Sequence, residues 1–529
     1  MSIRLSLDNA AGQLSGYDEP SVGLAKAIDL QVPMPLAIAN LKLDSSSPLP
    51  IHQQISQGIR TAVWSHQLSP GALLPTIKDL AQHLGVARNT IALAYVHLVD
   101  EGLCVSNTRR GTRVASDNPS LCPEEGRLET SGTSIATFDA AFNARHALET
   151  HVNRVGGGIP FALFASDPVL YPRTKLGRRL ADKFMRAPIA FLTRSETSRN
   201  VHFQKSVAAY LRNTRGISCD PDQVVAVSGL ESALNLIARV LLDPGDCVAV
   251  EDPTMDVVHS AFSLARAQMY PLPGDSQGAN PSRMKAPPAR LFCVSPSVGF
   301  PFGAQMSESR RLELLAMARA QNAIVFECDS CGELRYAGGR IKSLYGLDTD
   351  ERVIHYGGFF ETLGGFVNVG YLVVPRSLRD IFYEFGCRAV TAPPAPLLDA
   401  IAEFIEENEY SRHTRAVRSV YARRLDLVKR ACKDALPGVV ISEPLGGLHV
   451  VLQFDEDFDE RAVSEAATAE NLPVRSLSQY YQQKDRQQGV VLGFGAVSNQ
   501  SVPALVKRLS QLIDEAKRAA FVPVARISG

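Results

Sequence analysis

The chain contains 529 residues, of which 45% are hydrophobic and 21% are charged, and its 55 Lys and Arg residues balance its 55 Asp and Glu residues. This length exceeds one compact core and predicts several domains, while the zero net charge confines any nucleic-acid-binding surface to a local patch. No apolar run approaches the roughly 20 residues that span a bilayer, and the first residues lack the apolar core of a signal peptide. Nine cysteines, an odd number, fit a reduced compartment. We therefore expect a cytoplasmic protein with no membrane partner.

Changes in composition divide the chain into segments. The stretch after residue 116 is rich in Ser, Pro, Gly and charged residues, which is typical of a linker, whereas the stretches on either side of it are periodically apolar. We predict an N-terminal extension at 1–39, a compact helical domain at 40–116, a linker at 117–155, a large domain at 156–375, and a C-terminal helix with a small subdomain at 376–529.

Apolar runs alternate with amphipathic helical stretches beyond the linker. Strands that are apolar throughout and separated by helices indicate an α/β domain with a mostly parallel sheet covered on both faces. The predicted strands are 224–228, 247–250, 291–294, 323–326 and 353–355.

A helix-turn-helix pattern lies in the 40–116 segment. Thr76 and Lys78 precede Asp79 in a cap-x-x-acid sequence that starts a helix, and Gly85 permits the turn that follows. A second helix is predicted directly after this turn, with an apolar face formed by Ile91, Tyr95 and Leu98.

Polar residues occupy the exposed N-terminal end of that second helix. Arg88, Asn89 and Thr90 lie where a recognition helix reaches base edges, with Arg suited to guanine and Asn to adenine. A basic hairpin follows, whose turn glycine would let it contact phosphates or the minor groove. The predicted DNA-contacting residues are Thr76, Lys78, Arg88, Asn89, Thr90, Thr108, Arg109, Arg110, Gly111 and Thr112. A small helical bundle with a solvated basic loop is the alternative, but the order of these features favours DNA binding.

The stretch from Pro48 to Val114 resembles the winged helix of GntR-type regulators. The resemblance rests on Leu74-Pro-Thr-Ile-Lys-Asp-Leu-Ala81, Gly85-Val-Ala-Arg-Asn-Thr90 and Glu101-Gly102. It implies a double-stranded DNA operator as partner.

The remainder, over about residues 156–515, resembles the aminotransferase-like part of MocR regulators, which join this winged helix to a fold-type-I pyridoxal-phosphate domain. The matching landmarks include Arg215-Gly216, Val227-Ser-Gly229, Asp243-Pro-Gly-Asp246, Glu251-Asp-Pro253, Ser295-Pro-Ser297 and Val369-Gly-Tyr-Leu-Val373. The resemblance implies a smaller C-terminal subdomain and a homodimer.

The sequence departs from this family at the cofactor site. Glu361 occupies the position of the Schiff-base lysine, and a carboxylate cannot form that bond. Glu231 lies in the phosphate-binding turn, where its charge would repel a phosphate. Asn368 replaces an expected arginine, and only Asp329 matches the aspartate that pairs with the pyridine nitrogen. The candidate effector pocket at this former cofactor site comprises Gly229, Leu230, Glu231, Met255, Ser297, Asp329, Ser330, Glu361 and Asn368. We therefore expect no pyridoxal phosphate.

Glu231, Asp329 and Glu361 should converge if the fold is kept. Clustered carboxylates favour a cation, an amine or a shared proton. An equally good interpretation is that one or more of them pair with a nearby Arg or Lys, or simply face water. Cys328 and Cys331 bracket Asp329 with redox or zinc spacing, but no second Cys or His pair follows nearby, so core cysteines are expected and metal is not.

Three functions compete. The first is a transcription regulator whose aminotransferase-like domain is a pseudoenzyme that serves dimerisation and possibly senses a cationic or amine-bearing effector. The second is a conventional MocR regulator that binds pyridoxal phosphate non-covalently. The third is an active aminotransferase. The residues at the lysine and phosphate positions favour the first.

Overall fold

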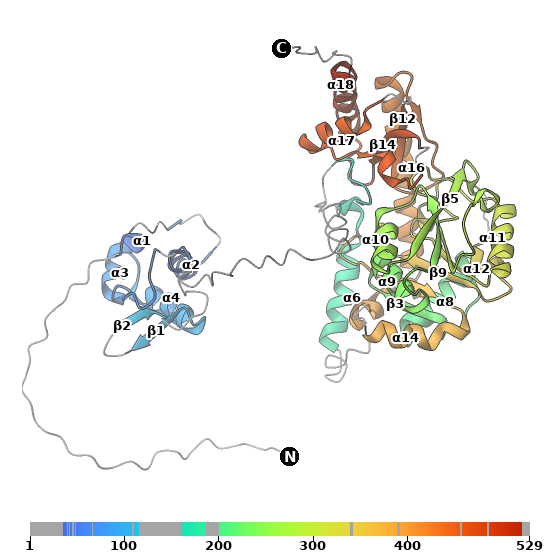
Figure 1. Ribbon diagram of the computed structural model, residues 1–529. Helices are drawn as coiled ribbons and strands as arrows, with labels where there is room; N and C mark the ends of the chain where they lie inside the picture. The colour runs from blue at the N-terminus through green and yellow to red at the C-terminus, as the bar shows by residue number, and fades with distance from the viewer. Residues whose placement is uncertain are drawn as a thin grey trace, which may run out of the picture. The chain divides into compact units, whose positions relative to one another are not determined.

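The computed structural model describes Pro35 to Ala520 with gaps, and it divides the chain into two compact units, Met1–Phe138 and Asp139–Gly529 (Figure 1). We call them the head and the body. The residues outside the description are 1–34, 40, 42, 45–46, 48, 66, 108–110, 116–159, 187–199, 339–341, 389–391, 455–457, 484–485 and 521–529. Most of the predicted N-terminal extension and the whole predicted linker are among them. No helix in the described part of the chain is long and apolar enough to cross a membrane.

The head is a helical domain with a two-stranded wing. Its elements are α1 (Leu36–Ala39), α2 (Ile51–Trp64), α3 (Ile77–Leu84), α4 (Arg88–Asp100), β1 (Cys104–Asn107) and β2 (Gly111–Val114), with β1 and β2 antiparallel. The backbone N–H of Asp79 donates to the Thr76 hydroxyl at 3.2 Å, and Gly85 ends α3 with a φ of +66°, so both predicted helix signals are confirmed. Ile38 of α1 is fully buried in the core of the head, so this unit begins before residue 40.

An eight-stranded sheet forms the centre of the body. Its order is β3-β10-β9-β8-β7-β4-β5-β6, in which β10 and β6 run antiparallel to their neighbours and the other pairs are parallel. The strands are β3 (Val224–Val227), β4 (Cys247–Asp252), β5 (Gln268–Asp275), β6 (Gly278–Ala279), β7 (Leu291–Val294), β8 (Ile324–Cys328), β9 (Val353–Gly358) and β10 (Gly370–Val373). The predicted mostly parallel sheet is therefore confirmed.

Helices cover both faces of this sheet because alternate strand residues point to opposite sides. One face packs against α9 (Gly229–Leu241), α10 (Asp256–Leu264) and α14 (Arg379–Arg388). The other packs against α8 (Val201–Thr214), α11 (Glu308–Ala320), α12 (Leu344–Leu347) and α15 (Ala395–Glu406). A short helix, α13 (Phe360–Leu363), follows β9 directly.

The C-terminal part of the body forms a smaller subdomain with its own core. Its sheet has the order β11-β12-β14-β13, with strands Val440–Ile441, His449–Phe454, Gln488–Gly493 and Arg475–Ser476, respectively. Helices α16 (Glu409–Ala435), α17 (Glu460–Ala469) and α18 (Val502–Ala520) pack with it.

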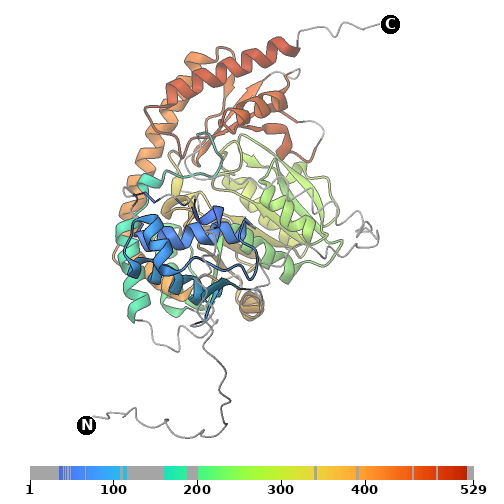
Figure 2. The ribbon, with the colours of Figure 1, turned by 90° about the vertical axis from the view of Figure 1, so that its left-hand side faces the viewer.

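Helix α16 connects the part of the body that contains α6 with the small subdomain (Figure 2). At its start, Glu409 accepts hydrogen bonds from Lys175 at 2.9 Å and from Arg179 at 3.2 Å, both on α6 (Arg173–Arg186). At its end, the hydroxyl of Ser510 on α18 donates to the carbonyl of Ala435 at 2.7 Å. Helix α6 is amphipathic, since Leu176 is buried while Lys175 and Arg179 pair with carboxylates.

Candidate functional site

The N-terminal end of α4 presents polar side chains to solvent. Arg88 and Asn89 are exposed and Thr90 is half-buried, while the predicted inward face is buried. Helix α4 is fixed to α2 because the Arg60 guanidinium donates to Glu101 at 3.0 Å. The exposed groups therefore stand on a rigid support, as a recognition helix requires.

The other predicted DNA contacts lie on α3 and on the wing. Lys78 is exposed, whereas the Thr76 hydroxyl both accepts from the Asp79 N–H and donates to the Asp79 carboxylate at 2.7 Å, so it acts first as a helix cap. Gly111 has a φ of +77° at the start of β2, which suits a tight turn. The Thr112 hydroxyl lies 3.3 Å from that of Ser106 on β1. The predicted contacts Thr108, Arg109 and Arg110 lie outside the described residues.

Glu361 lies in α13, immediately after β9. Its Oε2 atom is buried and has no hydrogen-bond partner among the described residues. Burial raises the pKa of this carboxyl to about 7, its own backbone N–H opposes the shift, and the negative charge of Asp329 adds to it. The two carboxyls are therefore electrostatic neighbours, as the sequence predicted for this pair.

Asp329 follows β8 at the same edge of the sheet. Its Oδ2 atom lies 3.3 Å from the Arg215 guanidinium, which also lies 3.3 Å from Glu333. Its Oδ1 atom is buried without a partner in the described part of the chain. Asp329 thus combines both interpretations left open by the sequence, because one oxygen is paired with an arginine and the other is not.

The turn that begins α9 is occupied by a side chain of the body itself. Asn368, with a φ of +25°, donates from its amide to the Ser228 carbonyl at 3.3 Å. Gly229 has a φ of +82°, and a Cβ atom there would lie 2.2 Å from the Asn368 Oδ1 atom. Glu231 lies in the first turn of α9 and is exposed, unlike the enclosed Asp329 carboxyl.

The remaining predicted pocket residues differ in exposure. Met255 is buried in the main core and Leu230 packs against it, whereas Ser297 and Ser330 are partly exposed. Burial raises the pKa of the Cys328 thiol to about 12 and that of the Cys331 thiol above its ordinary value, which disfavours the reactive thiolate. No group of three or more metal-ligating side chains gathers within the described residues.

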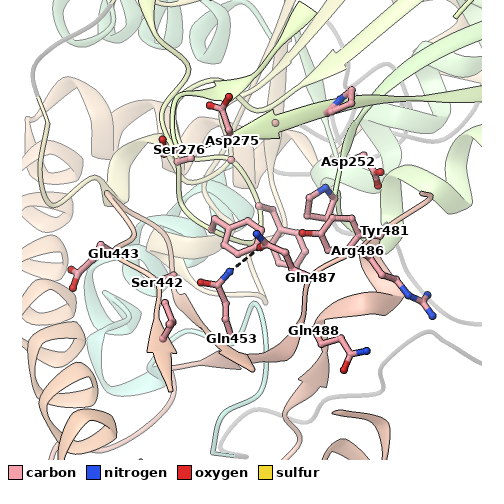
Figure 3. A pocket seen from close by; sticks show the side chains of 18 of the residues that line it. Asp252, Asp275, Ser276, Ser442, Glu443, Gln453, Tyr481, Arg486, Gln487 and Gln488 are labelled. Atoms are coloured by element: carbon pink, nitrogen blue, oxygen red, sulfur yellow. Dashed lines mark hydrogen bonds between the residues drawn. The ribbon is translucent and has the colours of Figure 1, made fainter. Parts of the chain in front are cut away.

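The body also contains a cleft that the sequence did not predict (Figure 3). It has a volume of about 1550 Å³ and separates the edge formed by β4, β5 and β6 from the β11 and β12 edge of the small subdomain. Asp252 accepts from the backbone N–H of Gln482 at 2.7 Å, and the Gln453 amide donates to Gln487 at 2.8 Å across the lining. None of the predicted pocket residues lines the cleft.

Comparisons with known proteins assign each unit to a class. Residues 51–114 match the family of bacterial regulatory proteins named gntR, and residues 191–489 match aminotransferase class I and II. The head is thus a regulator-type DNA-binding domain and the body is an aminotransferase-type domain.

Relatives that share both units identify the family. The chain is 27% identical to the probable rhizopine catabolism regulatory protein MocR of Rhizobium meliloti, over 92% of this chain and 98% of that protein. It is 26% identical to the pyridoxine biosynthesis transcriptional regulator PdxR of Corynebacterium glutamicum, over 90% of this chain and 99% of that one. The chain belongs to the MocR-type transcription regulators of the GntR family.

Solved structures support the fold of the body. An archaeal alanine:glyoxylate aminotransferase superimposes with a TM-score of 0.63 at 23% identity, covering 71% of this chain and 94% of that one. A kynurenine aminotransferase of Pyrococcus horikoshii gives a TM-score of 0.63 at 24% identity, covering 74% of this chain and 99% of that one. The fold-type-I architecture is therefore confirmed.

Proposed function

We propose that this regulator binds operator DNA through its head while its body neither binds pyridoxal phosphate nor catalyses transamination. The observation that carries the proposal is the enclosed Glu361 carboxyl beside Asp329, at a position that the family resemblance assigns to the Schiff-base lysine. Without a lysine at this position the covalent link to the cofactor cannot form.

The surrounding residues also fit the cofactor poorly. The Asp329 carboxylate, which would pair with a pyridine nitrogen, is already paired with Arg215. The Asn368 side chain crowds Gly229, where a phosphate would approach the N-terminus of α9, and Glu231 adds a negative charge to that first turn. These contacts support a body without the cofactor.

Addition of pyridoxal phosphate to the purified full chain should produce no visible absorption band of a protein-bound imine. Glu361→Lys should recover little binding, because Asn368 and Glu231 still obstruct the phosphate position. The measurement is an absorption titration followed by borohydride reduction and peptide mapping. A reducible adduct on a lysine of this pocket in the parent protein would overturn the proposal.

Two buried acceptor atoms support an effector role for the same pocket. Glu361 Oε2 and Asp329 Oδ1 both lack a donor among the described residues, and buried acceptors usually have one. An ammonium group supplies such donors together with a compensating charge. We therefore propose an amine-bearing effector. We further propose that the body forms a homodimer that holds two heads at a fixed spacing.

Arg88→Ala should remove about 1 to 3 kcal/mol of discrimination at particular base pairs, because an exposed arginine at this end of α4 is placed to contact a base edge. Arg109→Ala, between β1 and β2 in the sequence, should instead weaken binding to all sequences similarly and lower the slope of log affinity against log salt by about one unit. Binding titrations against single-base operator variants at several salt concentrations distinguish these effects. Unchanged base preference in Arg88→Ala would contradict the assignment of α4 as the recognition helix.

A further inference from the structure

Helix α4 carries apolar side chains on its outer surface. Leu93 is 43% exposed and Val96 is 51% exposed, although most of the other apolar residues of this helix are buried or partly buried. Such side chains gain nothing from the core of the head. Exposed apolar side chains that adjoin one another are a better sign of a partner contact than isolated ones, which are common on protein surfaces.

Leu93 and Val96 lie on the same face of α4 as Asn89, which is one of the predicted base-contacting residues. Leu93 follows Asn89 by four residues and Val96 follows Leu93 by three, so the three side chains form one stripe at helical spacing. Ile91 and Leu98, which pack into the core, lie on the opposite side. A helix that presents Asn89 to the major groove therefore presents Leu93 to it as well.

The charge of this helix suits DNA as the partner. The segment from Arg88 to Val99 contains no Asp or Glu, and the first carboxylate, Asp100, comes only at the last residue of α4. Leu93 lies about 6 Å along the helix axis from Asn89, which is less than two base-pair steps. The apolar group that DNA displays in the major groove is the C5-methyl group of thymine.

We infer that Leu93 is a specificity-determining residue that contacts the methyl group of a thymine within about two base pairs of the base read by Asn89. Val96 borders this contact on the side away from Asn89. The inference rests on the proposed DNA-binding function and extends it from hydrogen bonds to an apolar contact.

The test uses the full chain and an operator duplex that it selects from a random pool. Each thymine is replaced in turn by deoxyuridine, which keeps the hydrogen-bonding groups and removes only the methyl. Replacement of the contacted thymine should weaken binding about fourfold. This factor corresponds to the free energy of burying one methylene-sized apolar group. Leu93→Ala should bind the thymine and uracil duplexes equally.

Leu49→Ala is the matched control, since Leu49 is 44% exposed but precedes α2 instead of lying on α4. It should keep the fourfold preference for the thymine duplex. The inference is overturned if no thymine is methyl-sensitive, or if Leu93→Ala retains the preference. Failure of the full chain to select any sequence would instead overturn the proposed function, so the two failures are distinguishable.

Discussion

The isolated head, residues 35–116, should bind operator DNA about 10² to 10⁴ times more weakly than the full chain. A dimeric body converts the binding of the second head into an intramolecular event, and this gain is lost when the heads are separate. The head has its own buried core, which includes Ile38, so it should fold alone when residue 35 is included.

Fluorescence-anisotropy titrations of both proteins on the same two-site duplex measure this difference. Fusion of the head to an unrelated dimeric protein with matching spacing should restore most of the lost affinity. On a duplex with a single half-site, the head and the full chain should bind with similar affinity. Equal affinity on the two-site duplex would show that the body does not hold two heads together.

Glu361→Gln should weaken the pH dependence of the stability of the body, of which Glu251, another buried carboxyl with a pKa raised to about 7, would remain a source. The pKa of Glu361 is raised from its ordinary value of 4.5 to about 7, chiefly by burial. A carboxyl whose pKa is higher in the folded than in the unfolded protein stabilises the folded state. This contribution is complete below pH 4.5 and is lost as the pH rises to about 7. Because one pKa unit corresponds to about 1.4 kcal/mol, the loss amounts to at most about 3.5 kcal/mol.

Denaturant unfolding of the full chain at pH 5 and pH 8 measures this loss. Far-UV circular dichroism follows mainly the body, whereas the fluorescence of Trp64, the only tryptophan, follows the head. Glu231→Gln, at an exposed position in the first turn of α9, is the matched control and should unfold as the parent does. An identical pH dependence in the parent and in Glu361→Gln would contradict the buried position of this carboxyl.

The same variant also tests the proposed amine site. Propylamine should stabilise the body of the parent at pH 8, where Glu361 is ionised, because a ligand that binds only the folded state raises its stability. Propionate should have no such effect, and neither compound should stabilise Glu361→Gln. Equal stabilisation of the two proteins by propylamine would place its binding elsewhere.

Local signals in the sequence were sufficient for the helix-turn-helix part of the head, although they did not predict that α1, with the buried Ile38, belongs to it. Thr76 and Gly85 mark the ends of α3 through chemistry that depends on neighbouring residues only, and both act in the structure as predicted. Leu93 lies on the outer face of α4 by the same helical spacing, although only polar residues of this face were predicted to contact DNA.

The contacts of the body required the three-dimensional structure. The pairing of Asp329 with Arg215 joins residues 114 positions apart, and no periodicity relates them. The cleft is formed by the edges of two separate sheets, so its lining is scattered along the chain. The sequence predicted that Asp329 and Glu361 lie close together, but it predicted neither the Arg215 partner of Asp329 nor the lining of the cleft.

The attachment of the first residues of the body has a mechanical consequence. Asp167 accepts from Arg424 of α16 at 2.7 Å, its N–H donates to Tyr421 at 2.9 Å, and Phe161 lies in the core of the small subdomain. The segment that continues from the linker is therefore anchored to the small subdomain. Any shift of the small subdomain therefore also displaces the first described residues of the body, because Asp167 is held by two side chains of α16.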